Sequence, residues 1–366
     1  MTMFNPSRLE FARKRRGLTK KSLASKVGLT PRSISMFENN EAPPSDETIQ
    51  KLSLALTFPR SFFLSADEVD VPQQEAVSFR AMSKMSAAKR DTALMAGGIA
   101  FMFNEWIEER FTLPKSDLIE VEKGEDPEAA AMMLRQHWGV GELPIRNVIH
   151  LLEAKGIRVF SLAENAVEVD AYSLWKDNTP FVFLNTLKSA ERSKFDAAHE
   201  LGHLILHKHG APVGQEAERE ADQFASAFLM PRGGVLAVSS HLATLTSLIK
   251  LKKKWDVSLA ALAYRMHKLG TLTDWHYRTL CIEMSKKGYH KNEPEGVERE
   301  RSKIWEMVFK ALREDGINKE QIARDLDIHS SEIESLVFGL ILMNVIQGSS
   351  LSDGKKTRPS YLQVVK

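Results

Sequence analysis

The stretch AAHELGHLILH, residues 197–207, places histidines at positions 199, 203 and 207 and a glutamate at position 200. It lies in a proline-free run with apolar residues at helical spacing, which predicts one helix from about residue 190 to 207. Residues four apart lie on nearly the same helix face, so His199 and His203 can reach one metal ion. His207 lies roughly 12 Å from His199 along the axis, so we expect it to pack or to support a ligand.

Glu200 is rotated by about 100° from His199 around the helix axis, so it lies beside the ion without pointing at it. A carboxylate in that position can take a proton from a metal-bound water and pass it to a departing amine. The pattern therefore predicts a hydrolytic site with Glu200 as general acid/base. An HExxH string also occurs by chance in unrelated proteins, so the downstream sequence must supply a further ligand.

The next helix, EAEREADQFASAFLMP at 216–231, offers Glu216, Glu218 and Glu220 as third ligands. We favour Glu218, because Asp222 lies one turn further on the same face and can orient a metal-bound histidine through its free ring nitrogen. The alternative for all three glutamates is a solvated acidic helix start. Zinc is the default ion for two imidazoles and a carboxylate, with manganese or iron as alternatives.

The run from about Phe79 to Pro294 resembles the ImmA/IrrE family of zinc-dependent peptidases, whose members carry AHELGHxxLH followed by ExEAxxFAxxLLMP. Here these motifs read AAHELGHLILH and EREADQFASAFLMP. The resemblance implies a zincin-like domain that holds its metal on His199, His203 and Glu218, uses Glu200 as general acid/base and cleaves a repressor protein at one site. The candidates for stabilising an oxyanion are Tyr172, Tyr264, Arg265 and His276.

Residues 5–64 predict five short helices. Thr19 and Thr30 are suited to cap the second and third helices, and Gly28 offers a left-handed turn position between them. The apolar residues of these two helices have the spacing of a helix-turn-helix unit. They are Leu23, Ala24, Val27, Leu29 and Ile34.

Residues 8–64 resemble the phage-repressor-like (Cro/C1, or XRE) family. The resemblance implies that the helix at 30–38 enters the major groove of double-stranded DNA, that Arg13 pairs with Glu38, and that the protein acts as a homodimer on two half-sites. The implied DNA-binding residues are Thr30, Arg32, Ser33 and Ser35 on this helix, with Arg15, Arg16, Lys20 and Lys21 near phosphates. Lys20 stands where the family usually has glutamine. The alternative is a protein-interaction module with a solvated basic face.

Charge is unevenly distributed along the chain. Residues 1–65 hold eleven Lys or Arg and five Asp or Glu, a net charge of +6, whereas the whole chain carries +2. A basic head on a mildly acidic body fits a polyanion partner for the head. We expect a cytoplasmic protein without a membrane partner, because we find no membrane-length apolar run, no secretory signal and only one cysteine, Cys281.

A second helix-turn-helix pattern follows near the carboxyl end. Adding 299 to the five apolar positions of the head gives Ile322, Ala323, Leu326, Ile328 and Ile333. Asn318 replaces the capping Thr19, and Asp327 replaces Gly28 in the turn. Residues 329–339 hold Glu332 and Glu334 but neither Lys nor Arg, so we expect this unit to contact protein rather than DNA.

The whole pattern predicts a mainly α fold with a small β-sheet (α+β). The strands are expected in IRVFSL, VEVDAYSLW and TPFVFLN, with helices at 86–110, 127–137 and 144–155. The predicted organisation is a five-helix head over 1–65, a linker over 66–76, a metallopeptidase domain over 77–235, a helical extension over 236–292, and a helical domain with the second helix-turn-helix-like unit over 293–366.

Two functions follow from this organisation. The first is a DNA-binding regulator fused to a site-specific endopeptidase that cleaves a transcriptional repressor. The second is a transcription factor whose metallopeptidase-like domain acts as a sensor without proteolysis. The presence of Glu200 favours the first, because a sensor could keep the three ligands without it.

Overall fold

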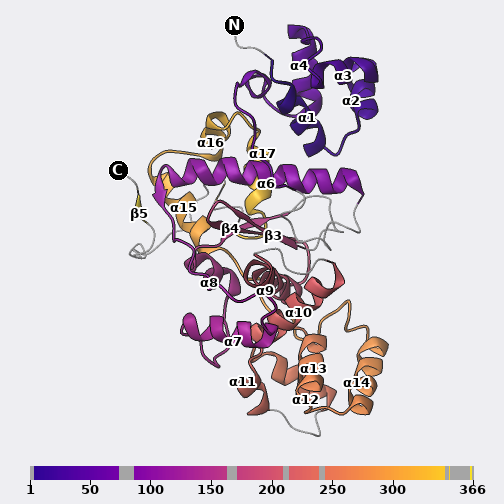
Figure 1. Cartoon of the computed structure of the whole chain (residues 1–366), viewed down its shortest axis with the longest axis vertical. Helices are drawn as coiled ribbons and strands as arrows, with labels where there is room; N and C mark the ends of the chain where they lie inside the picture. The colour runs from indigo at the N-terminus through magenta and orange to yellow at the C-terminus, as the bar shows by residue number, and fades with distance from the viewer. Residues whose placement is uncertain are drawn as a thin grey trace.

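The computed structural model describes residues 4–73, 86–162, 171–208, 214–238, 244–342, 346 and 363–364. Helices make up most of this part of the chain, and its strands form one three-stranded and one two-stranded sheet. The predicted fold class, mainly α with a small β-sheet, is confirmed. The molecule is elongated: the amino-terminal helices lie at one end, the larger sheet in the middle, and the helices of residues 245–286 at the other end (Figure 1).

The amino-terminal head has the predicted helix-turn-helix geometry. Its elements are α1 (Pro6–Arg15), α2 (Lys20–Val27), α3 (Pro31–Glu38), α4 (Asp46–Leu56) and the 3-10 helix η1 (Arg60–Leu64). The side chains of Thr19 and Thr30 cap α2 and α3, and Gly28 takes a φ of 70° between them. The implied pairing of Arg13 with Glu38 is confirmed, at 2.6 and 3.0 Å. Of the five predicted helices, only the fifth differs from the prediction, because it is a 3-10 helix and not an α-helix.

The larger sheet lies between two long helices (Figure 1). Its strands are β2 (Arg158–Ser161), β4 (Thr179–Leu184) and β3 (Ala171–Lys176), in that order; β2 runs parallel and β3 antiparallel to the central β4. The helices are α6 (Ala87–Glu108) on one face and α9 (Ala190–Leu206) on the other. All three predicted strands are present, although residues 167–170 of the second prediction lie outside the described part.

Three further helices surround α9. They are α7 (Pro127–His137), α8 (Val148–Ala154) and α10 (Gln215–Leu229). The prediction for α7 is confirmed at both ends, but the helix predicted from residue 144 begins at Val148. The reason is local, because the Asn147 side chain accepts the His150 N–H at 2.8 Å and so caps the helix there.

Beyond α10 the chain forms a helical unit at the end of the molecule opposite the head (Figure 1). Its elements are α11 (Arg232–Leu236), α12 (Leu245–Lys252), α13 (Leu259–Lys268) and α14 (Asp274–Lys286). The segment that follows returns along the body and is tied to it. Glu293 accepts the Leu259 N–H at the start of α13, and Glu300 accepts the Val148 N–H at the start of α8.

The carboxy-terminal unit repeats the geometry of the head at the predicted offset. It contains α15 (Lys303–Glu314), α16 (Lys319–Asp325) and α17 (Ser330–Val337), and α17 begins and ends 299 residues after α3. Asn318 caps α16. Asp327 takes a φ of 54°, so it has the left-handed conformation that Gly28 has in the head. A short sheet pairs β1 (Phe111–Thr112) with β5 (Gln363–Val364).

The two helix-turn-helix units of the chain contact each other through a buried ion-pair cluster. Glu332 on α17 accepts hydrogen bonds from Arg15 at 2.6 Å and from Arg16 at 2.5 Å, both at the end of α1. The side chains of Arg15 and Glu332 are 1% and 2% exposed. For Arg15, whose side chain is buried against Glu332, the expectation of a position near DNA phosphates is therefore wrong. Arg15 and Arg16 hold the head against the body through their contacts with α17.

The head also rests on α6. Thr92 donates a hydrogen bond to the carbonyl of Lys14 at 3.2 Å, and Trp106 at the other end of α6 donates to Asp325 of the carboxy-terminal unit at 3.1 Å. Thus α6 contacts both helix-turn-helix units and the sheet. None of the helices in the described ranges has an apolar stretch long enough to cross a membrane.

We predict that Glu332→Gln destabilises the protein by about 1.5–3 kcal/mol, because it removes the buried carboxylate charge that pairs with Arg15 and Arg16. Chemical denaturation followed by circular dichroism measures the loss. The control is Glu334→Gln on the same helix, whose more exposed pairing with Lys319 contributes about 1 kcal/mol or less. Equal stability of the two variants would contradict this role of the cluster.

Candidate metal centre

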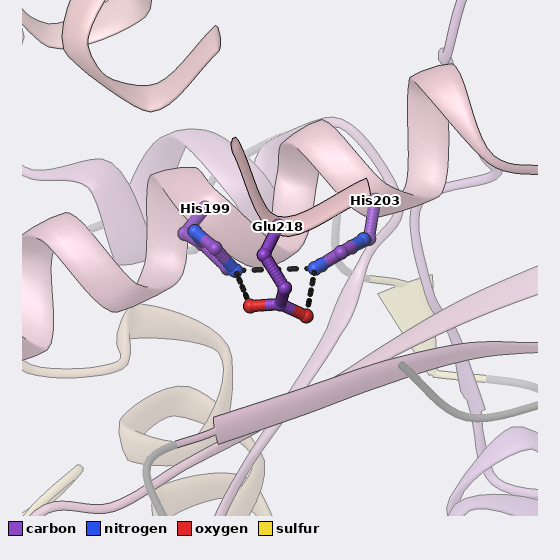
Figure 2. Close-up of side chains that lie close together, drawn as sticks. All are labelled: His199, His203 and Glu218. Atoms are coloured by element: carbon purple, nitrogen blue, oxygen red, sulfur yellow. Dashed lines mark hydrogen bonds and ion pairs between the residues drawn. The ribbon is translucent and has the colours of Figure 1, made fainter. Parts of the chain in front are cut away.

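Helices α9 and α10 bring two imidazoles and one carboxylate to a common point (Figure 2). The Nε2 atoms of His199 and His203 are 3.1 Å apart, and the two carboxylate oxygens of Glu218 lie 3.4 Å from the first and 3.5 Å from the second. Two ligands at about 2.1 Å from one tetrahedral ion are about 3.4 Å apart. The spacing and chemistry of this donor set therefore fit a zinc-sized dication.

The other two candidate ligands lie elsewhere. Glu216 is exposed and lies 3.5 Å from Arg219, and Glu220 contacts His207 at 3.0 Å. Of the three glutamates that the sequence offers, the structure therefore places Glu218 with the histidines, the residue that we favoured.

The close approach of the two helices depends on a glycine within the HELGH sequence. A Cβ atom at Gly202 would lie 3.2 Å from the Cα atom of Ala221 and 3.1 Å from a ring carbon of Phe224, both on α10. The small residues Gly202 and Ala221 thus let the two helix backbones come close together. This contact brings Glu218 within reach of the imidazoles of α9.

Each histidine is held at its second ring nitrogen. Asp222 of α10 lies 2.9 Å from Nδ1 of His199, which is the support that the sequence predicted for it. Nδ1 of His203 instead lies 2.7 Å from Nδ1 of His207. His207 thus contacts a member of the cluster without joining it.

Glu200 lies on α9 next to the cluster, and its side chain is buried. Ser173 of β3 donates a hydrogen bond to one Glu200 carboxylate oxygen at 2.7 Å. Burial raises the pKa of Glu200 to about 7, against a weaker lowering by His199 and Ser173. Sequence reasoning missed Ser173, because in the predicted strand VDAYSLW it singled out the neighbouring Tyr172 instead.

The charges of the cluster without an ion show what a cation would displace. Burial lowers the pKa of His199, but contacts with Asp222 and Glu218 outweigh this and raise it to about 10. Burial lowers the pKa of His203 to about 4. Burial would raise the pKa of Glu218, yet its hydrogen bonds to both rings hold it well below its usual range. Since a ligating imidazole must be neutral, a cation would displace the proton on His199.

Two of the candidate oxyanion donors have hydrogen-bond partners elsewhere. The Tyr172 hydroxyl is buried and donates to the carbonyl of Ala93 at 3.0 Å. Arg265 donates to the carboxylate of Glu128 at 2.8 and 3.0 Å. Tyr264 packs edge-on against Tyr277, and His276 lies on α14. The donor groups of Tyr172 and Arg265 are therefore engaged in other contacts.

The candidate DNA-binding residues lie at the outer side of the head. Thr30 and Arg32 are exposed, and Ser33 and Ser35 are partly exposed. The hydroxyls of Thr30 and Ser33 are 2.9 Å apart at the start of α3. Lys20 is 38% exposed and lies 3.2 Å from Glu38, so it extends the Arg13–Glu38 pair. Arg32 is therefore the candidate on α3 with an exposed positive charge.

Comparison with protein-family models gives two matches. Residues 152–267 match the Peptidase_M78 model, described as "IrrE N-terminal-like domain", and residues 9–63 match a model described as "Helix-turn-helix". A search of curated proteins finds no match. The first matched segment contains the cluster of His199, His203 and Glu218 together with Glu200, and the second contains α3.

We predict that Gly202→Ala lowers both the stability and the zinc affinity of the protein. Overpacking costs about 1–3 kcal/mol, whereas the better helix propensity of alanine returns at most about 1 kcal/mol. The strain falls between α9 and α10 and moves Glu218 away from the imidazoles. Thermal unfolding of the metal-free protein and a zinc titration measure the two effects. A more stable variant with unchanged affinity would show that the helices do not need this glycine.

Proposed function

Because the chain joins an ImmA/IrrE-like Peptidase_M78 domain to an XRE-type helix-turn-helix domain, we infer that it is a DNA-binding regulator fused to a zinc-dependent, site-specific endopeptidase. The substrate that we propose is a transcriptional repressor protein. The observation that carries this function is the convergence of His199, His203 and Glu218 next to a buried Glu200. A structural ion would not need a buried carboxylate beside it.

His199, His203 and Glu218 would hold the metal, with zinc as the default and manganese as the alternative. Such an ion supplies Lewis acidity, which polarises a peptide carbonyl and acidifies water. Glu200 takes the proton of the attacking water on its carboxylate and delivers it to the departing amine. Ser173, by donating to one oxygen of that carboxylate at 2.7 Å, holds Glu200 in position for both transfers.

The head supplies the location for this chemistry. Its exposed Arg32 and the neighbouring polar residues of α3 would meet bases and phosphates in the major groove of double-stranded DNA. A homodimer would place two heads on two half-sites. Binding beside the site of a repressor raises the local concentration of substrate, so a slow and selective peptidase gains turnover without new contacts.

The second candidate function is a transcription factor whose metallopeptidase-like domain acts as a sensor without proteolysis. A continuous set of contacts between the head and the metal centre favours it. Thr92 of α6 bonds to the head, and the next residue, Ala93, accepts a bond from Tyr172. The residue after Tyr172 is Ser173, which bonds to Glu200. The two functions differ in whether Glu200 is needed for chemistry.

We predict that the purified protein with zinc or manganese cleaves one of the helix-turn-helix repressors encoded beside it at a single bond. Glu200→Gln should reduce the cleavage rate by about 10²–10⁴-fold, because it removes the proton acceptor and donor. Mass spectrometry of the fragments over time identifies the cleaved bond and measures the cleavage rate. Glu200→Gln should bind zinc as the wild type does. Cleavage by both the wild type and Glu200→Gln would favour the sensor function. Cleavage of none of the neighbouring repressors by either of them would favour it too.

We predict that Arg32→Ala weakens binding to a duplex selected from a random library by about 1–3 kcal/mol, because Arg32 is placed to contact base edges. Fluorescence anisotropy at fixed salt measures the change. Arg60→Ala is the matched control, since it removes the same charge from an exposed side chain of the head that pairs with Asp46. An equal loss of DNA affinity in both variants would show that Arg32 contributes only its positive charge and makes no specific base contact.

A further inference from the structure

The two imidazoles of the metal centre are supported in different ways. His199 contacts a carboxylate of α10 directly, through Asp222. His203 reaches a carboxylate of the same helix through another ring: its Nδ1 lies 2.7 Å from Nδ1 of His207, and Nε2 of His207 lies 3.0 Å from a carboxylate oxygen of Glu220. Neither His207 nor Glu220 has a role in the function proposed above.

Hydrogen-bond chemistry gives this row of groups one direction. If Nε2 of His203 binds a metal, its lone pair is used there and the neutral ring carries its proton on Nδ1. That proton can be donated only to a ring nitrogen with a lone pair, so Nδ1 of His207 must be the acceptor. The neutral His207 then carries its own proton on Nε2 and donates it to the Glu220 carboxylate. Each link thus sets the tautomer of the one before it.

We propose that His207 and Glu220 are positioning residues for the metal ligand His203, and that together they form an orienting relay from α10 to the metal centre. This inference rests on the metal site proposed above. The relay fixes both the tautomer and the rotation of the His203 ring, which direct Nε2 towards His199 and Glu218. Outer partners of this kind change metal affinity by about 10–100-fold.

The position of the relay in the fold supports this role. His207 is the C-cap residue directly after α9, and its backbone N–H donates to the carbonyl of His203 at 3.1 Å. The side chains of His207 and Glu220 are 11% and 23% exposed, so water competes little for their mutual contact. Because Nδ1 of His207 faces the side of His203 opposite to Nε2, His207 cannot join the metal ligands without breaking this contact.

The test is the zinc affinity of the full chain, measured by competition with a chromophoric chelator. His207→Ala and Glu220→Ala should each weaken zinc binding about 10-fold or more. Because the two links act in series, the double variant should bind no more weakly than His207→Ala alone. His207→Asn places an amide oxygen near the position of Nδ1, so it should retain more affinity than His207→Ala, and Glu220→Ala should add little to it.

Glu216→Ala is the matched control, since it makes the same change on α10 at an exposed residue and should leave the affinity unchanged. Circular dichroism of each metal-free variant shows that it is folded, and Glu220→Ala is the milder variant if His207→Ala unfolds. Unchanged affinity in Glu220→Ala, or additive losses in the double variant, overturns the relay alone. A wild-type chain that binds no zinc overturns the proposed metal centre as well.

Discussion

The structure depends on the close contact between α9 and α10 at Gly202. A helix carrying HELGH presents two imidazoles by its own periodicity, but two imidazoles alone make an incomplete site. The carboxylate must come from another helix. The distance between the two helix backbones determines whether that carboxylate lies close enough to the imidazoles to share a metal ion with them. Gly202 against Ala221 keeps that distance short, and the buried ring of Phe224 packs against Gly202. The metal centre is therefore a consequence of packing between two helices.

The head and the body are joined by charges that the sequence alone assigns to another task. Arg15 and Arg16 contribute to the +6 charge of the head, yet both form ion pairs with Glu332 within the chain. This cluster forms only when the carboxy-terminal unit is folded in place, because its carboxylate, Glu332, lies on α17. Two units with the same helix geometry thus differ in function through surface charge: one keeps an exposed cation on its third helix, and the other uses a carboxylate there to hold its counterpart.

The sequence predicted features that depend on near neighbours. The caps at Thr19 and Asn318 and the turns at Gly28 and Asp327 follow from bonds and dihedral angles within a few residues, which is why the repeat at an offset of 299 was visible. The pairing of Arg15 with Glu332 and of Ser173 with Glu200 was not predicted. These partners are 317 and 27 residues apart, and their contact exists only once the tertiary fold has formed. Solvated and internally paired arginines look the same in a sequence.

The acidic start of α10 shows how helix geometry separates similar residues. Glu218 and Asp222 are four apart and share one face, so one lies with the ligating nitrogens and the other at the far nitrogen of His199. Glu220 is rotated by about 200° from Glu218 and contacts His207, one turn beyond the ligands. Three carboxylates within five residues therefore reach three different positions. The spacing of the histidines on α9, four and four, matches these positions, so the two helices specify the site jointly.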